Sequence, residues 1–141
     1  LAADKKPLTK EESAKVIEAA IRKVAKKPTG ELTKADLEKV TVLELYQNQL
    51  TDVKGLEKLT QLEGLYLSIN QLADVKGLEK LTQLTKWLAL NGNKLTSVKG
   101  LEKLTQLERL SLDDNPDLTK AQIDELKKAL PKCDISSNPT K

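Results

Sequence analysis

The ten-residue string VKGLEKLTQL occurs three times without change, at Val53–Leu62, Val75–Leu84 and Val98–Leu107. The first two copies are 22 residues apart and the next two are 23 apart. A unit of this length cannot bury an apolar face alone, so such repeats stack on their neighbours and share one continuous core. The repeat therefore predicts a solenoid.

A second pattern, L-x-L-x-x-N, recurs four times beside the first, with its asparagines at Asn48, Asn70, Asn93 and Asn115. Its two leucines stand at alternate positions and would face the same side of a β-strand. The asparagine follows where the chain must turn, and its amide can both donate to and accept from unpaired backbone groups. We expect these four residues to form a structural ladder.

Together the two patterns match the template L-x-x-L-x-L-x-x-N-x-L. The 22-residue unit, with Asp52-Val53 and Asp74-Val75 after the asparagine, resembles the bacterial internalin-type leucine-rich repeat. The segment from Ser13 to Leu37 resembles the helical N-terminal cap of such proteins. This resemblance implies an α/β fold, namely a right-handed solenoid with a curved parallel sheet on a concave binding face and short 3-10 or turn segments on the convex face.

We expect one structural domain in three parts: an N-terminal tail and helical cap (1–39), four repeats (40–118), and a C-terminal helical cap with a tail (119–141). Caps are needed because a repeat array exposes its core at both ends. Thr9 with Glu12 predicts a capping box at the start of a helix. The apolar stripe of this helix that should face the first coil is Ala14, Ile17, Ile21 and Val24. A second short helix is expected from Thr33 to about Lys39.

At the other end, Thr119 with Gln122 predicts the start of a helix. Its inward stripe would be Ile123, Leu126 and Leu130, and Cys133-Asp134-Ile135 is consistent with a last short strand.

The outward positions of the strands differ between repeats, whereas the decapeptide is constant. All three aromatic residues of the chain fall at these positions. Exposed Tyr, Trp and Arg are typical of binding hot spots, although Tyr and Trp also simply favour strands. The candidate contact residues are Glu44, Tyr46, Tyr66, Ser68, Trp87, Ala89, Asn91, Arg109, Ser111 and Asp113. The third repeat has one extra residue, so either Lys86 or Trp87 could face the groove.

Composition argues against catalysis and against other partners. The chain has no His and one Cys, which removes the commonest general base and excludes an internal disulfide. Its net charge of +3 is too small to indicate nucleic acid, and no apolar run is long enough for membrane insertion. The acidic stretch from Asp113 to Asp117 lacks the spacing and the glycine of an EF-hand calcium loop. We expect no metal and no cofactor.

These observations predict a non-enzymatic module, a monomer, that binds a protein or peptide on the concave face. Tyr46, Tyr66 and Trp87 would be apolar anchors, and Glu44, Arg109 and Asp113 would set the charge preference. The alternative is a structural spacer or an engineered consensus-like scaffold without a ligand. Leu1-Ala2-Ala3-Asp4 fits either the remnant of a small-residue signal-cleavage site or a trimmed end, and slightly favours a secreted or cell-envelope location.

Overall fold

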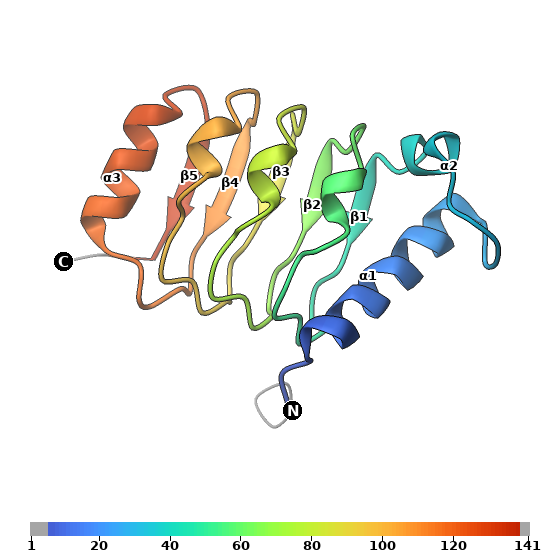
Figure 1. The fold of residues 1–141 in the computed structure, drawn as a ribbon. Helices are drawn as coiled ribbons and strands as arrows, with labels where there is room; N and C mark the ends of the chain where they lie inside the picture. Colours follow the sequence, from blue (N-terminus) through green and yellow to red (C-terminus); the bar gives the residue numbers. More distant parts are fainter. Residues whose placement is uncertain (1–5, 139–141) are drawn as a thin grey trace.

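A computed structural model describes residues 6–138 of the chain; the Leu1–Asp4 segment and the last residues of the tail lie outside this range. Helices α1 and α2 come first, four strand-and-turn coils follow, and α3 leads into a final strand (Figure 1). The elements are, in chain order, α1 (Lys10–Ala25), α2 (Lys34–Glu38), β1 (Val42–Glu44), η2 (Leu56–Lys58), β2 (Gly64–Tyr66), η3 (Leu78–Lys80), β3 (Trp87–Ala89), η4 (Leu101–Lys103), β4 (Arg109–Leu112), α3 (Lys120–Ala129) and β5 (Asp134–Ser137).

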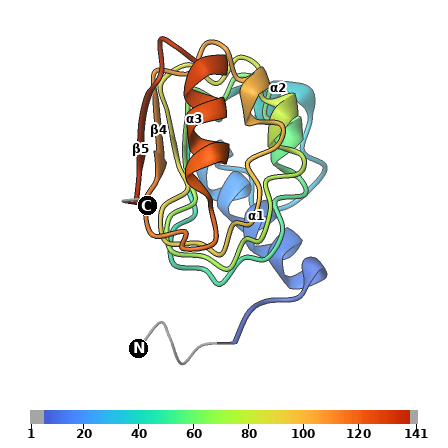
Figure 2. The same ribbon diagram turned by 90° about the vertical axis from the view of Figure 1, so that its left-hand side faces the viewer.

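The strands form one parallel sheet in the order β1-β2-β3-β4-β5. Matching positions of successive coils lie side by side, as in the triplet Leu43, Leu65 and Leu88. The sheet occupies one side of the molecule, and the 3-10 helices η2, η3 and η4 occupy the other (Figure 2). The predicted leucine-rich-repeat solenoid is confirmed, and the sheet has one strand more than the four repeats alone would supply.

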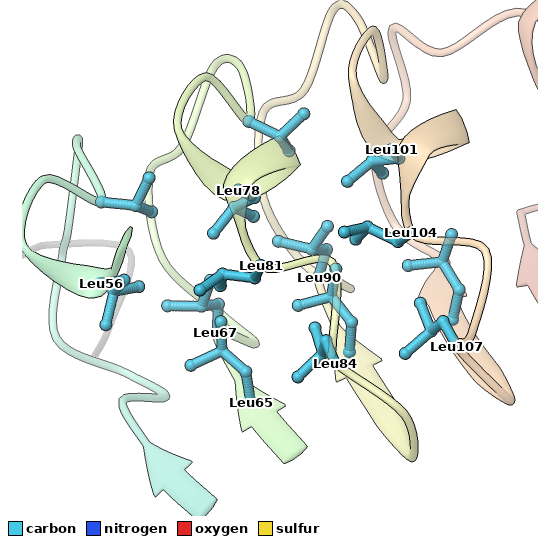
Figure 3. Packing of buried hydrophobic residues seen from close by; sticks show 14 of the residues in the cluster. Leu56, Leu65, Leu67, Leu78, Leu81, Leu84, Leu90, Leu101, Leu104 and Leu107 are labelled. Atoms are coloured by element: carbon cyan, nitrogen blue, oxygen red, sulfur yellow. The ribbon is translucent and has the colours of Figure 1, made fainter. Parts of the chain in front are cut away.

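The core is a stack of leucines between the sheet and the 3-10 helices. Leu65 and Leu67 point inward from β2 and the residues after it, and Leu78, Leu81 and Leu84 meet them from the η3 side (Figure 3). All five side chains are at most 2% exposed. The alternation of leucines along each strand thus places one face of the sheet in the core and leaves the other face free.

Each decapeptide makes the same turn. Its glycine, as at Gly77, has φ near +106°, a left-handed conformation that side chains disfavour, and it opens the 3-10 helix. The side chain of the glutamate two residues later folds back toward this glycine, so that Glu79 Oε1 accepts the Gly77 N–H at 2.8 Å. The backbone N–H groups of Gly77 and of Glu79 itself lower the pKa of the Glu79 carboxyl, and the cationic Lys80 and Lys103 lower it further. The hydrogen bond to Gly77 gives this carboxylate a structural role in the turn.

The N-terminal cap begins with the predicted capping box. The Thr9 side chain accepts the Glu12 N–H, and the Glu12 side chain accepts the Thr9 N–H. The inward stripe of α1 differs from the prediction, because Val24 is 42% exposed. The residues buried on that face are Ser13, Ile17, Ile21 and Ala25. Their uniform spacing of four residues turns Val24 to the edge of the helix.

The other two helices, α2 and α3, begin where the sequence predicts. Thr33 caps α2 and Thr119 caps α3, each through a capping box. Ile123, Leu126 and Leu130 are buried as predicted. The strand suggested around Cys133 is β5, which pairs with β4 and extends the sheet by one strand.

Candidate functional site

The outward side chains of the five strands form a surface that we call the sheet face. The strand register arranges them in three rows that run across the sheet. The first row is Val42, Gly64, Trp87, Arg109 and Asp134, and the second is Glu44, Tyr66, Ala89, Ser111 and Ser136. The third row lies at and just beyond the strand ends and contains Tyr46, Ser68, Asn91, Asp113 and Asn138.

Trp87, and not Lys86, takes the groove position in the third repeat. It lies opposite Gly64 on one side and opposite Arg109 on the other. This register places the extra residue between Leu84 and Trp87, before the strand begins. Lys86 leaves the face and its Nζ pairs with Glu63 Oε1 at 3.4 Å.

The Trp87 indole lies over Gly64. A Cβ atom built on Gly64 would stand 2.6 Å from both Cε2 and Nε1 of the indole, so the ring fills the space of the missing side chain. Tyr66 packs beside it, with ring centroids 5.7 Å apart and planes inclined by 43°. An inclined aromatic pair at this distance is a favourable contact. We call Gly64, Tyr66 and Trp87 the aromatic ledge.

Polar side chains on the rest of the face are held by one another. The Ser68 hydroxyl donates to Asn91 Oδ1 at 2.7 Å. Asp113 Oδ2 accepts the Ser136 hydroxyl at 2.8 Å and the Ser111 hydroxyl at 3.4 Å. These bonds fix the orientation of the polar groups that a ligand would meet.

A hollow of about 520 Å³ opens beside the aromatic ledge. Tyr66 and Trp87 form one side of it. Ala89, the smallest residue of the second row, lies between that side and β4. The other side carries charged and hydroxyl groups, from Arg109, Ser111, Asp134 and Ser136. An apolar wall thus faces a polar wall across a small floor, which suits a side chain with an apolar body and a polar end.

Not all of the candidate residues gather at this hollow. Tyr46 is 51% exposed and lies in the third row at the β1 end, away from the Tyr66–Trp87 pair in the first two rows. Glu44 is exposed and lies opposite Tyr66 in the sheet register. The three aromatic residues therefore form one contacting pair and one separate tyrosine.

The asparagines differ in what they bond. Asn70, Asn93 and Asn115 are buried, and the amide of each reaches backbone groups of its own coil and of the preceding coil. Asn70 Oδ1 accepts the N–H groups of Asn48 and Leu50, both at 3.0 Å. Asn48 is only half-buried and donates to the Tyr46 carbonyl, because the first coil has no coil before it.

A second hollow, of about 430 Å³, lies between α1, α2 and the η2 coil. Its apolar lining includes Ile17 and Ile21, which are at most 3% exposed and hold α1 to the first coil. We assign this hollow to the seam of the cap. Residues 6–138 contain no group of three or more His, Cys, Asp or Glu placed to hold a metal ion.

Known leucine-rich-repeat proteins share the architecture of this chain. The family model for leucine-rich repeats (two copies) matches residues 38–80. Internalin C2 from Listeria monocytogenes superposes with a TM-score of 0.75 and 27% identity over 85% of this chain. The chain is an internalin-like leucine-rich-repeat protein.

Two further structures resemble this internalin-like protein. A second internalin of Listeria monocytogenes (inlF) is 30% identical over 89% of the chain, with a TM-score of 0.74. A leucine-rich-repeat protein from Leptospira interrogans is 28% identical over 75% of the chain, with a TM-score of 0.53. The chain spans 52% of the internalin C2 chain, 36% of the second internalin and 34% of the Leptospira protein. No curated protein sequence matches it.

Sequence reasoning missed three residues of the site in this internalin-like protein. Asp134 and Ser136 belong to β5, and the sheet face was counted over four strands only. The alternation of apolar and polar residues from Cys133 to Ser136 is the signal that could have shown them. The sequence places Gly64 at an outward strand position, but Gly64 is not among the candidate contact residues because it has no side chain to offer; a glycine inside a strand often marks a close approach.

Proposed function

We propose that this protein is a non-enzymatic recognition module that binds a peptide or a protein loop on the sheet face. The observation that carries the proposal is the aromatic ledge beside a polar-walled hollow. Trp and Tyr in such settings are the residues that dominate binding energies in protein interfaces. A constant scaffold that presents a different set of outward residues in every coil supports the same proposal.

The size of the sheet face limits the partner. Five strands about 4.8 Å apart, each showing about 10–15 Å of its length, present about 200–350 Å². A standard protein–protein interface buries about 800 Å² on each partner. The sheet face alone therefore suits an extended peptide or a protruding loop.

The test starts from a random peptide library displayed on phage and selected on the intact protein. The affinity of a selected synthetic peptide is then measured for the parent and for a variant with Tyr66→Ala and Trp87→Ala. Each hot-spot truncation costs about 2 kcal/mol or more, so we expect at least a tenfold loss of affinity. The control is Lys54→Ala with Lys76→Ala on the opposite side, which should bind as the parent does.

Undiminished binding by the folded double alanine variant would contradict the proposed site. A selection that enriches no specific peptide would instead favour the spacer interpretation.

The proposal extends to assembly and location. We propose a monomer that acts in the cell envelope or outside the cell, as the likeness to internalins suggests. None of the helices within the described residues has the length and apolar content to cross a bilayer. Sedimentation and fractionation of the native organism test the two statements; a stable dimer or an exclusively cytosolic pool would contradict them.

A further inference from the structure

Gly64 stands at an outward position of β2 where the other strands carry a side chain. Glycine is unfavourable in a strand, because it has no side chain to pack and loses more backbone freedom than other residues. The backbone of Gly64 is also outside the left-handed region, so other residues could adopt its conformation. Backbone geometry therefore does not explain why glycine stands here.

The Trp87 ring does explain it. Cε2 and Nε1 of the indole lie 2.6 Å from the place where a Cβ of residue 64 would be, and Cζ2 lies 2.9 Å from it. Real Cβ atoms essentially never come so close to another atom, so any side chain at this position must displace the ring. Trp87 lies directly opposite in the neighbouring strand, which brings its side chain over Gly64.

Packing alone holds the ring in place. Its second neighbour is Tyr66, with a centroid distance of 5.7 Å. The indole N–H is buried and has no hydrogen-bond partner within residues 6–138. A buried unpaired donor is unfavourable, so the indole N–H does not hold the ring where it is, and the ring is positioned by packing that includes Gly64 and Tyr66.

We infer that Gly64 is the positioning residue of the binding site: it provides the seat that fixes Trp87 before a partner arrives. This inference rests on the proposed function. A side chain that is already ordered loses little freedom on binding, so a seated ring binds more tightly than a mobile one. Gly64 acts only through Trp87 and makes no contact with the partner.

The first experiment needs no ligand, because Trp87 is the only tryptophan of the chain. Tryptophan emission and its quenching by acrylamide are measured for the parent, Gly64→Ala and Ser68→Thr. In Gly64→Ala we expect emission at longer wavelength and stronger quenching, since the added methyl displaces the indole. Ser68→Thr adds a methyl in the same coil, two residues beyond the end of β2 and in the third row, and should match the parent.

Fold integrity is followed by far-UV circular dichroism. Alanine is the better strand residue, so Gly64→Ala should remain folded. If it does not, adding Trp87→Ala must restore folding by removing the clashing ring. Parent-like emission and quenching in a folded Gly64→Ala, or an unfolded double variant, would overturn the inference.

The second experiment uses the selected synthetic peptide as its probe. Gly64→Ala should weaken binding about tenfold, comparable to the loss of a hot-spot contact. In the Trp87→Ala background the same change should have no further effect. If Trp87→Ala itself binds as the parent does, the proposed function fails while the seat stands. If Trp87→Ala weakens binding and Gly64→Ala, with a displaced ring, does not, the positioning role is wrong.

Discussion

Replacement of Asn93 by alanine should destabilise the protein far more than the same change at Asn48. Asn93 is 4% exposed, and its Oδ1 accepts the Leu72 N–H at 3.1 Å. Its Nδ2 donates to the carbonyls of Leu67 and Leu90, both at 3.0 Å. All three bonds are buried; those to Leu67 and Leu72 join Asn93 to the preceding coil, and the bond to Leu90 lies within its own coil.

The size of the expected loss of stability follows from the hydrogen bonds that each backbone group retains in Asn93→Ala. The Leu67 carbonyl still accepts from Asn70 and the Leu90 carbonyl from Asn115, so each loses one of its two bonds. The Leu72 N–H loses its asparagine partner. One orphaned buried donor costs about 1–3 kcal/mol and each further lost bond about 1 kcal/mol, which gives a loss of about 3–5 kcal/mol. This is a large part of the roughly 5–15 kcal/mol that stabilises an ordinary domain.

The assay is urea unfolding at neutral pH, followed by circular dichroism and by Trp87 fluorescence. Asn48→Ala is the matched control, since its side chain donates only to the exposed Tyr46 carbonyl and should cost about 1 kcal/mol or less. If Asn93→Ala lowers the free energy of unfolding by no more than Asn48→Ala does, the ladder does not stabilise the fold and the reasoning is refuted.

Three other predictions test the caps and the C-terminal strand. Deletion of residues 1–39 removes Ile17 and Ile21, whose burial contributes about 1.5–3 kcal/mol each to the stability of the fold. Light scattering and calorimetry should show an aggregating or unfolded product. A soluble monomer with an undiminished cooperative melt would show that this segment is not a cap. Hydrogen bonds from Lys27, at 2.8 Å, and from Thr33 hold the pKa of Asp36 well below its usual value of 3.8. The stability they confer is therefore present above about pH 4 and lost on further acidification, so the melting temperature of the parent should fall more steeply from pH 4 to pH 2 than that of Asp36→Asn; parallel curves would contradict this. Burial, helped by the adjacent Asp134 carboxylate, raises the pKa of Cys133 to about 11, so a thiol reagent at pH 8 should label the folded protein slowly and the urea-unfolded protein rapidly; equal rates would argue against a protected thiol.

The solenoid could be predicted from the sequence because its repeats are exact. A ten-residue string copied three times places the same leucines in the same coil positions, and the packing of one coil then holds for the next. The helix starts at Thr9, Thr33 and Thr119 could be predicted equally well, since each threonine acts on a residue three positions away. The capping box of Thr33 with Asp36 was not predicted. Information of this kind is local or periodic.

The errors arose where tertiary contacts decide. Val24 is more apolar than Ala25, yet the face of α1 that packs on the first coil repeats every four residues and includes the alanine and not the valine. The groove position of Trp87, which the sequence leaves open between Lys86 and Trp87, is decided by the pairing of β3 with both neighbouring strands. The seat at Gly64 depends in turn on that register, so neither the ledge nor the contribution of β5 could be derived from one strand at a time.

The most direct test of the proposed binding site is an amide and indole NMR titration of the parent protein with the selected synthetic peptide. We predict shifts in the Trp87 indole N–H and in the backbone of residues 64–68, 87–91, 109–113 and 134–136, all on the sheet face. The three decapeptide segments on the opposite side should keep their positions. Shifts concentrated in those decapeptides, with an unchanged indole resonance, would contradict a binding site on the sheet face.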